Sequence, residues 1–146
     1  MKRIFVLLLF SLLLISLVAC TANVQSNSFF FEGETVNIAI RSTNGYSYKI
    51  DGANISFLKD KNECATGTFY KNSFIEHNKA AIAASYEEVH SEKTDGGEYA
   101  IYKCISEEGS PQYVVLVTYN KTSHLYIKSD SDLDIVKTIL DEFSVR

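Results

Sequence analysis

The sequence places three carboxylates at alternate positions near its C-terminus, at Asp130, Asp132 and Asp134. Carboxylates with this spacing suit a hard cation such as calcium, and Asp141 falls at the twelfth position of an EF-hand register. The sixth position of that register is Ile135, however, where the loop needs glycine for its sharp turn. We therefore expect no metal here, and we interpret the carboxylates as the negatively charged N-terminal cap of a helix.

The sequence gives little support for histidine or nucleophile chemistry. The three histidines, His77, His90 and His124, lack the short paired spacings of zinc ligands. The chain has no G-x-S-x-G elbow and no cysteine with an orienting histidine. We therefore expect no catalytic residue and no cofactor. A triad built from distant residues leaves no mark in one sequence, so an enzyme stays the alternative.

Tyrosines are the more interesting group. Tyr99, Tyr102, Tyr113, Tyr119 and Tyr126 all fall in segments with strand patterns. If they stand together on an exposed sheet face, they form a platform for a glycan or a peptide, because aromatic rings offer rigid contact area with a polar tip. The competing interpretation is that tyrosine is simply a favoured strand residue. We take Tyr99, Tyr113, Tyr119 and Tyr126 as the candidate ligand-binding residues.

Cys20 ends an apolar run that begins after the basic residues Lys2 and Arg3. The run, residues 4–18, is shorter than the roughly 20 residues that a membrane-spanning helix needs. A basic start, an apolar middle and a small residue, Ala19, before the cut are the layout of a secretory signal.

The segment Leu17-Val18-Ala19-Cys20 resembles the lipobox of prokaryotic lipoproteins. The resemblance implies that the Cys20 thiol receives a diacylglycerol and that a dedicated signal peptidase cuts before Cys20. Two acyl chains anchor a protein stably where one does not. We therefore expect a lipid-anchored protein on the outer side of the cell membrane, or on an outer membrane if the source has one. The alternatives are an uncleaved anchor helix, or an ordinary secretory signal in which Cys20 is incidental.

Lipidation of Cys20 leaves Cys64 and Cys104 as a candidate pair. Export puts both in a compartment where disulfides persist. A bridge would close a loop of about 40 residues, worth roughly 4 kcal/mol by the chain-entropy argument. The sequence thus predicts a Cys64–Cys104 disulfide, with two separate buried thiols as the alternative.

The chain divides into a signal peptide at 1–19, a lipidated tether at 20–28 and a single domain at 29–146. Without the signal peptide, 12 basic residues face 18 acidic ones, a net charge of −6. That balance, with no basic cluster, argues against nucleic acid as a partner.

Strand patterns occupy both halves of the domain. In residues 34–42, Val36, Ile38 and Ile40 alternate with more polar residues, which indicates a half-buried strand. Residues 48–60 hold one or two short strands.

Three further strands are expected at residues 99–106, 112–119 and 124–129. The middle one is apolar on both faces, so we place it at the centre of an antiparallel meander.

Helical spacing appears in two segments. The segment from 72 to about 91 carries a stripe of Ile75, Ile82, Tyr86 and Val89. The C-terminal segment carries Leu133, Val136, Leu140 and Phe143 at the same kind of spacing.

The order of strands, helix, strands and helix predicts an α+β domain with both helices packed on an antiparallel β-sheet. This order resembles the Mog1/PsbP-like α/β/α sandwich, which also occurs in bacterial lipoproteins, and no functional residue carries over from it. The expected function is a non-enzymatic binding or accessory module for a protein or cell-envelope ligand such as a glycan. The alternative is a small envelope hydrolase or an inhibitor of one.

Overall fold

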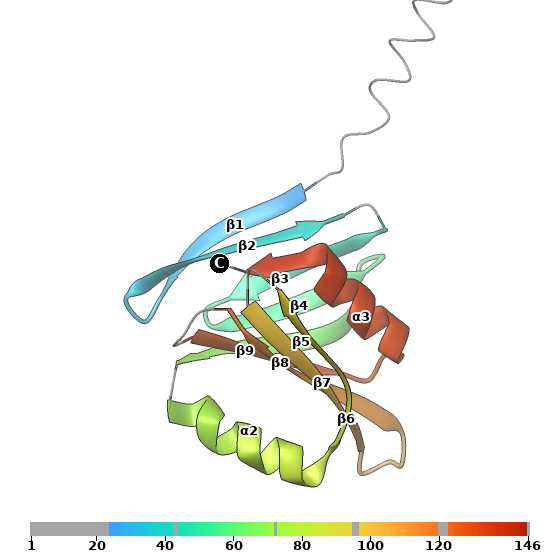
Figure 1. Ribbon diagram of the computed structural model, residues 1–146. Coiled ribbons are helices and arrows are strands. Elements are labelled where there is room, and N and C mark those ends of the chain that lie inside the picture. The colour runs from blue at the N-terminus through green and yellow to red at the C-terminus, as the bar shows by residue number, and fades with distance from the viewer. Residues whose placement is uncertain (1–23, 43, 72, 95–96, 120–122, 146) are drawn as a thin grey trace, which may run out of the picture.

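Two antiparallel sheets make up most of the computed structural model (Figure 1), which describes residues 24–42, 44–71, 73–94, 97–119 and 123–145. The larger sheet has the order β3-β4-β5-β9-β8-β7-β6, and the smaller has the order β1-β2-β10. The elements are β1 Val24–Phe31, β2 Glu34–Arg41, β3 Tyr46–Asp51, β4 Asn54–Lys59, β5 Asn62–Lys71, α2 Ser73–Ser85, β6 Glu87–Thr94, β7 Gly97–Ile105, β8 Pro111–Thr118, β9 Ser123–Ser129, α3 Leu133–Glu142 and β10 Phe143–Val145.

The strongest sequence patterns form the elements they predict. Val36, Ile38 and Ile40 of β2 point inward and are almost fully buried. Strand β8 lies between β9 and β7, and its apolar residues Val114 and Val115 are buried on opposite faces. The central position predicted for this strand is therefore confirmed.

The main core lies between the smaller sheet, helix α3 and one face of the larger sheet. Val136, Ile139 and Leu140 of α3 are buried in it, and Leu133 packs against it. The apolar stripe predicted for the C-terminal helix is confirmed at Leu133, Val136 and Leu140, whereas Phe143 follows the helix as the first residue of β10. The ring of Phe57 on β4 meets the ring of Phe143 edge-on, with centroids 5.0 Å apart. This contact ties the residue that follows α3 to strand β4, next to the β3 edge of the larger sheet.

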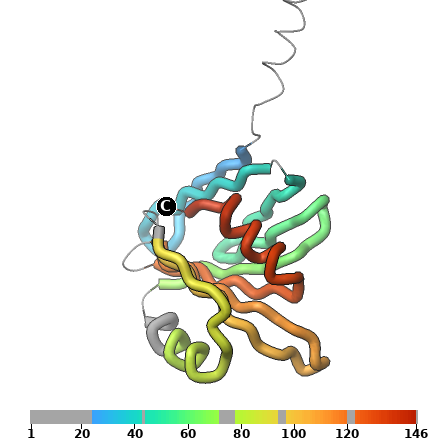
Figure 2. Tube along the Cα trace, turned by 45° about the vertical axis from the view of Figure 1, so that its right-hand side comes forward, coloured from blue at the N-terminus to red at the C-terminus, as the bar shows by residue number. Residues whose placement is uncertain are grey.

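Helix α2 covers the opposite face of the larger sheet. Ile82 packs there in a second, smaller core with Tyr102, Val114 and Leu116. Figures 1 and 2 both place α2 at the lower end of the molecule and the smaller sheet at the upper end. The two helices therefore lie on different faces of the larger sheet.

The mid-chain helix is shorter than predicted. It ends at Ser85, and residues 87–94 form the edge strand β6, which pairs with β7. Val89, expected on the helix, lies in β6 and packs against the main core. Pairing with a neighbouring strand has overridden the local helical pattern. The side chain of Ile75 lies outside the part of the chain whose side chains the structure describes.

The α+β prediction holds in its coarser form, an antiparallel sheet with a mid-chain helix and a C-terminal helix. The domain is richer in strands than expected, because β1, β5, β6 and β10 were not foreseen.

The domain also begins earlier than predicted, because residues 24–28, assigned to the tether, are the first part of β1. Gln25 bonds to the backbone of Tyr48 through its side-chain amide. Phe29 and Phe31 place their rings 5.1 Å and 6.3 Å from that of Phe69. These three side chains hold the polar-looking segment in the fold. Residues 1–23, including Cys20, lie outside the described residues.

The predicted disulfide between Cys64 and Cys104 is wrong, and both thiols are free. Cys64 lies on β5 and Cys104 on β7, with β9 and β8 between them. Three interstrand spacings of about 4.8 Å separate these strands by about 14 Å, well beyond the reach of a disulfide. Cys64 packs against the main core, whereas Cys104 packs against the second core.

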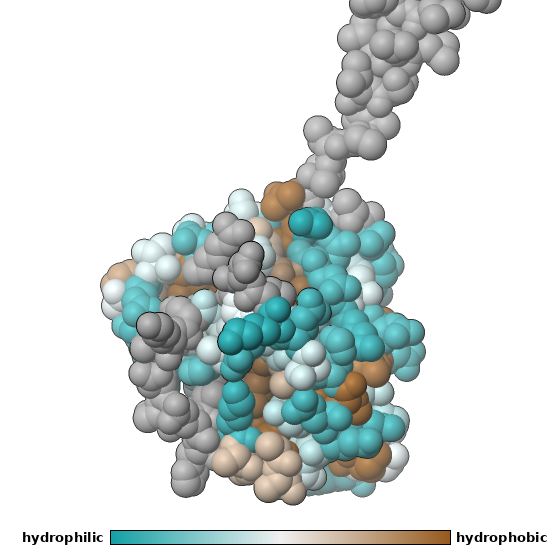
Figure 3. Space-filling model, viewed as in Figure 1, coloured by the Kyte–Doolittle hydropathy of each residue, from teal (hydrophilic) through white to brown (hydrophobic). Residues whose placement is uncertain are grey.

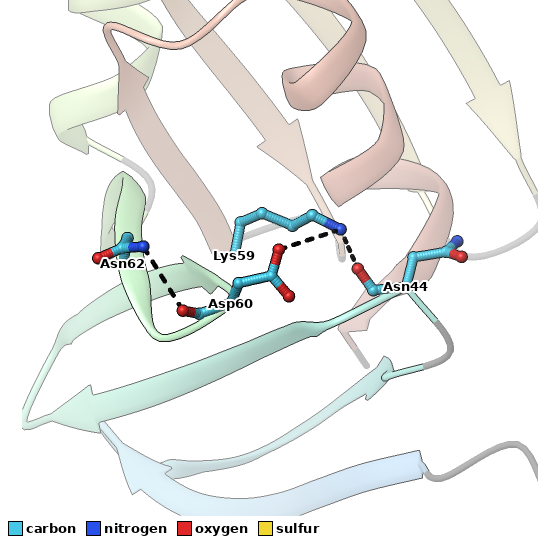
Figure 4. Close-up of polar contacts among 4 residues, drawn as sticks. All are labelled: Asn44, Lys59, Asp60 and Asn62. Carbon is cyan, nitrogen blue, oxygen red and sulfur yellow. Dashed lines mark hydrogen bonds and ion pairs between the residues drawn. The ribbon is translucent and has the colours of Figure 1, made fainter.

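A polar cluster joins the β2–β3 loop to the β4–β5 turn (Figure 4). The Lys59 ammonium donates to the carbonyl of Asn44 and lies 4.0 Å from the Asp60 carboxylate. Asn62 donates to the carbonyl of Asp60 at 3.5 Å. Lys59 also lies 4.5 Å from the centroid of the Tyr46 ring. The ion pair is exposed and adds little stability, so the cluster mainly fixes the geometry of the two turns.

The acidic segment before α3 places Asp134 in the first turn of the helix, as expected, but it provides no side-chain cap. Asp132 occupies the N-cap position, but its side chain makes no capping hydrogen bond. Instead, Ser129 and Ser131 both donate to the carbonyl of Cys64, at 2.6 Å and 3.0 Å. The start of α3 is thus tied to β5 by two serines. Among the described residues, no group of three or more His, Cys, Asp or Glu side chains is placed to hold a metal.

Candidate functional site

The structure does not bring the four candidate tyrosines together on one exposed face. Tyr99, Tyr113 and Tyr119 all pack against the main core, and Tyr119 is buried. Tyr126 lies on the opposite face, against the second core, where Tyr102 is also buried. The predicted tyrosine platform is therefore wrong, and of the four only Tyr126 belongs to the site described next.

A groove of about 390 Å³ runs between α2 and the larger sheet. The helix contacts β5 on one side and β7 on the other, so it crosses the face above β9 and β8. The groove lies on the β5 side of the helix. Its lining residues come from β5, α2, β8 and β9, and they are Tyr70, Asn78, Ala81, Ile82, Ser85, Tyr86, Leu116 and Tyr126.

Strand register and the end of α2 position the three tyrosines. Thr68 pairs with Tyr126 and Tyr70 pairs with His124 in the β5–β9 ladder, so Tyr70 and Tyr126 are diagonal neighbours on one face. Side chains in that relation lie about 7–8 Å apart, within reach of aromatic rings. Tyr86 follows α2, and its N–H donates to the carbonyl of Ile82 at 2.8 Å. That bond holds Tyr86 beside the groove as if the helix continued.

Among the side chains that the structure describes, no charged one lines this groove. Burial raises the pKa of Tyr126, and the neighbouring Tyr86, Cys104 and Tyr70 raise it further. The Tyr126 phenol is therefore neutral at physiological pH, and its hydroxyl can both donate and accept a hydrogen bond. The amide of Asn78 and the hydroxyl of Ser85 add further polar groups along the helix side.

The arrangement suits a neutral ligand. Ile82, Leu116 and Ala81 provide an apolar base, and the tyrosines provide aromatic surface with polar tips. The volume lies within the roughly 300–1,000 Å³ typical of small-molecule pockets. A chemical group with apolar ring faces and hydroxyl or amide edges, such as a sugar, matches these surfaces.

A second cavity, of about 420 Å³, lies on the β7 side of α2. Its lining is charged with both signs, from Lys79, Glu88, Glu92, Lys93 and Glu98. Lys79 and Glu98 already form an ion pair at 3.3 Å. Because these two charges already pair with each other, they are less available to bind a ligand.

One histidine lies beside a carboxylate on the edge strand β6, and that carboxylate, Glu92, also borders the charged cavity. The His90 Nε2 is 3.9 Å from the Glu92 carboxylate, and the Tyr99 hydroxyl donates to Glu92 at 2.8 Å. Burial and the bond to Glu92 raise the pKa of Tyr99 to about 12. A phenol with that pKa is a poor proton donor or acceptor near neutral pH.

The other two histidines add nothing to this group. His124 is buried on the face of the larger sheet that α2 covers, with its Nδ1 3.0 Å from the hydroxyl of Thr118. The side chain of His77 lies outside the described part.

No family model, curated protein or solved structure matches this chain. The resemblance to the lipobox and that to Mog1/PsbP-like domains thus stay predictions. Within the described ranges, neither helix has the length and apolar composition that crossing a bilayer requires.

Sequence reasoning missed two of the three groove tyrosines. Tyr70 lies in a segment for which no strand was predicted, although Ala65, Gly67 and Phe69 alternate there with Thr66, Thr68 and Tyr70. That alternation is a strand signal. Tyr86 was counted as part of an apolar helical stripe, which concealed its exposure of 37%.

Proposed function

We propose that this protein is a lipid-anchored extracytoplasmic binding module, without enzymatic activity, that binds a neutral glycan segment of the cell envelope. The tyrosine-lined groove beside α2 is the observation that carries the ligand class. The anchor rests on Leu17-Val18-Ala19-Cys20 and its likeness to a lipobox.

Three features of the groove support a neutral ring-containing ligand over a charged one. The groove's described lining has no ionisable group apart from its phenols, and the raised pKa of Tyr126 keeps that phenol neutral. Its aromatic residues come from separate elements, β5, β9 and the end of α2, so they border the ligand from more than one side. The helix side adds the Asn78 amide and the Ser85 hydroxyl.

The alternative is a small envelope hydrolase or an inhibitor of one. The catalytic residues of such a hydrolase would lie around His90 and Glu92. That pair lies on the edge strand β6, whereas the groove's described lining comes from β5, β8, β9 and the α2 segment.

The test is a titration of the purified protein with an oligomer of N-acetylglucosamine, a neutral N-acetylated sugar. The chain has no tryptophan, so its intrinsic fluorescence comes from tyrosine and reports binding directly. Aromatic anchors cost about 2 kcal/mol or more when truncated. We therefore expect Tyr126→Ala and Tyr86→Ala each to weaken binding by at least about tenfold.

Two controls make the result specific. Tyr126→Phe keeps the ring and should retain most of the affinity. Lys79→Ala alters the charged cavity on the other side of α2 and should leave the affinity unchanged. Absence of binding by the unaltered protein, or equal affinity of Tyr126→Ala, would overturn the proposal. Cleavage of the oligomer would favour the hydrolase.

A further inference from the structure

The structure places the start of the folded domain very close to Cys20. Strand β1 begins at Val24, so only residues 21–23 separate it from the residue expected to carry lipid. Four Cα steps of at most about 3.6 Å span no more than about 14 Å. An anchor on Cys20 therefore holds the Val24 end of β1 within that distance of the bilayer surface.

The outward side of the smaller sheet carries no acidic residue, although the protein as a whole is acidic. Its residues alternate with the buried Val36, Ile38 and Ile40, and we call them the outer face. They are Val24, Ser26, Ser28 and Phe30 of β1, Thr35, Asn37, Ala39 and Arg41 of β2, and Ser144 of β10. None is acidic, although the whole chain carries 18 Asp and Glu residues.

Two large apolar side chains stand exposed on the outer face. Val24 is 55% exposed and Phe30 is 75% exposed, and they lie near opposite ends of β1. Figure 3 shows apolar surface at the upper end of the molecule, where β1 lies in Figure 1. Six residue steps of about 3.3 Å separate Val24 from Phe30 by about 20 Å. If β1 lies flat against a surface, both side chains meet it.

The single charge on the outer face has the sign that suits an anionic bilayer. Arg41 pairs with Val24 in the β1–β2 register, so it lies at the anchored end of the strand. Serine, threonine and asparagine side chains fill the middle of the face and can hydrogen-bond lipid headgroups. Glu34 points to the inner side, where its carboxylate lies 3.6 Å from the Lys71 ammonium.

We propose that the outer face of β1, β2 and β10 lies against the lipid bilayer, with Phe30 inserted at the interface. This inference rests on the proposed lipid anchor at Cys20. It has a consequence for the groove beside α2. In both Figure 1 and Figure 2 the smaller sheet and α2 occupy opposite ends of the molecule, so the groove beside α2 lies at the end away from the membrane.

The absence of tryptophan allows a direct test. In the Phe30→Trp protein a single tryptophan reports the outer face. The lipidated protein is reconstituted in vesicles of phosphatidylglycerol and phosphatidylcholine, with part of the phosphatidylcholine brominated. An apolar group at the interface lies about 5–10 Å deep, so we expect brominated lipid to quench at least about half of the tryptophan emission.

Matched variants locate the contact. Ile105 is 64% exposed at the end of β7, next to a turn at the lower end of the molecule. Ile105→Trp should therefore keep its emission. Thr35, which pairs with Phe30 on the outer face, gives a second probe in Thr35→Trp that should be quenched with Phe30→Trp. Inserting a flexible segment of about ten residues after Asn23 should weaken the quenching, because the domain can then leave the surface.

The intact mass of each protein is measured first and separates two failures. A protein without lipid on Cys20 contradicts the proposed anchor. A lipidated protein in which neither outer-face probe is quenched, or in which Ile105→Trp is quenched equally, overturns the proposed orientation alone.

Discussion

The side-chain amide of Gln25 hydrogen-bonds both backbone groups of Tyr48. Its Nε2 donates to the Tyr48 carbonyl at 3.0 Å, and its Oε1 accepts from the Tyr48 N–H at 3.2 Å. Tyr48 is on β3, the edge strand of the larger sheet. Gln25 thus completes the hydrogen bonding of an edge strand and joins the two sheets.

Replacing Gln25 should therefore loosen β1. Gln25→Ala leaves two partly buried backbone groups without their partner, which costs about 1–3 kcal/mol of unfolding free energy. Urea unfolding measures the loss, and hydrogen exchange should show faster exchange of the β1 amides. Ser26→Ala, on the exposed outer face, is the control and should change stability by no more than about 0.5 kcal/mol. Equal stability of the two variants would contradict the role given to Gln25.

The raised pKa of Tyr99 predicts how the stability of the protein changes at alkaline pH. Its pKa is raised from 10.0 to about 12 in the folded state, chiefly by burial and then by Glu92. The folded protein holds this proton more tightly than the unfolded chain does, so the stabilisation is present below pH 10 and is lost as the pH rises toward 12. Urea unfolding across that range should show a shallower loss of stability for Tyr99→Phe than for the unaltered protein. Identical slopes would contradict the raised pKa.

The two cysteines should behave as separate thiols. Cys64 and Cys104 lie on strands that are not neighbours and face different cores. Alkylation after unfolding without reductant should modify both, as read by the mass of the protein. In the folded state Cys64 should react slowly, since burial raises its pKa and disfavours the thiolate. A mass that shows no alkylation of these two residues would restore the disulfide.

Leu140 tests the packing of α3. The side chain is 9% exposed and belongs to the main core. Leu140→Ala should lower the unfolding free energy by about 2–5 kcal/mol, through lost burial and a cavity. Asp141→Ala, at the exposed neighbouring position, should change stability by about 0.5 kcal/mol at most. A small effect of Leu140→Ala in denaturant unfolding would place this residue at the surface.

Strong periodicity made much of this fold predictable. Strand β2 alternates cleanly, β8 is apolar on both faces, and α3 carries three core residues at helical spacing. In each case the burial pattern follows from the element's own sequence. The same holds for the order of β7, β8 and β9, because short turns connect them.

Strand β5 was not predicted from the sequence, because close packing requires a glycine, Gly67, in its interior. A Cβ at Gly67 would lie 2.8 Å from Ile55 Cγ2 and 3.0 Å from Leu125 Cδ1, so glycine is needed inside this strand. Glycine inside a strand usually weakens it, and no strand was predicted here. Without β5 and the sheet order, the sequence did not show that two strands lie between Cys64 and Cys104.

The groove could not be found from the sequence, because its tyrosines meet only through tertiary structure. Tyr70 and Tyr126 are brought together by the pairing of β5 with β9. Tyr86 joins them because α2 stops at Ser85 and β6 begins at Glu87. The sequence indicated that tyrosines mattered, and the sheet order decides which of them share a face.

The proposed lipid on Cys20 is tested most directly by metabolic labelling with fatty acid in a bacterial host. We expect the unaltered protein to incorporate the label and to start at Cys20 after cleavage. Cys20→Ser lacks the thiol that the lipid transfer needs, so it should lose both the label and the cleavage. Cys64→Ser should lose neither. Label retained by Cys20→Ser, or an unlabelled wild-type protein, would contradict the account of this chain as a membrane-anchored lipoprotein.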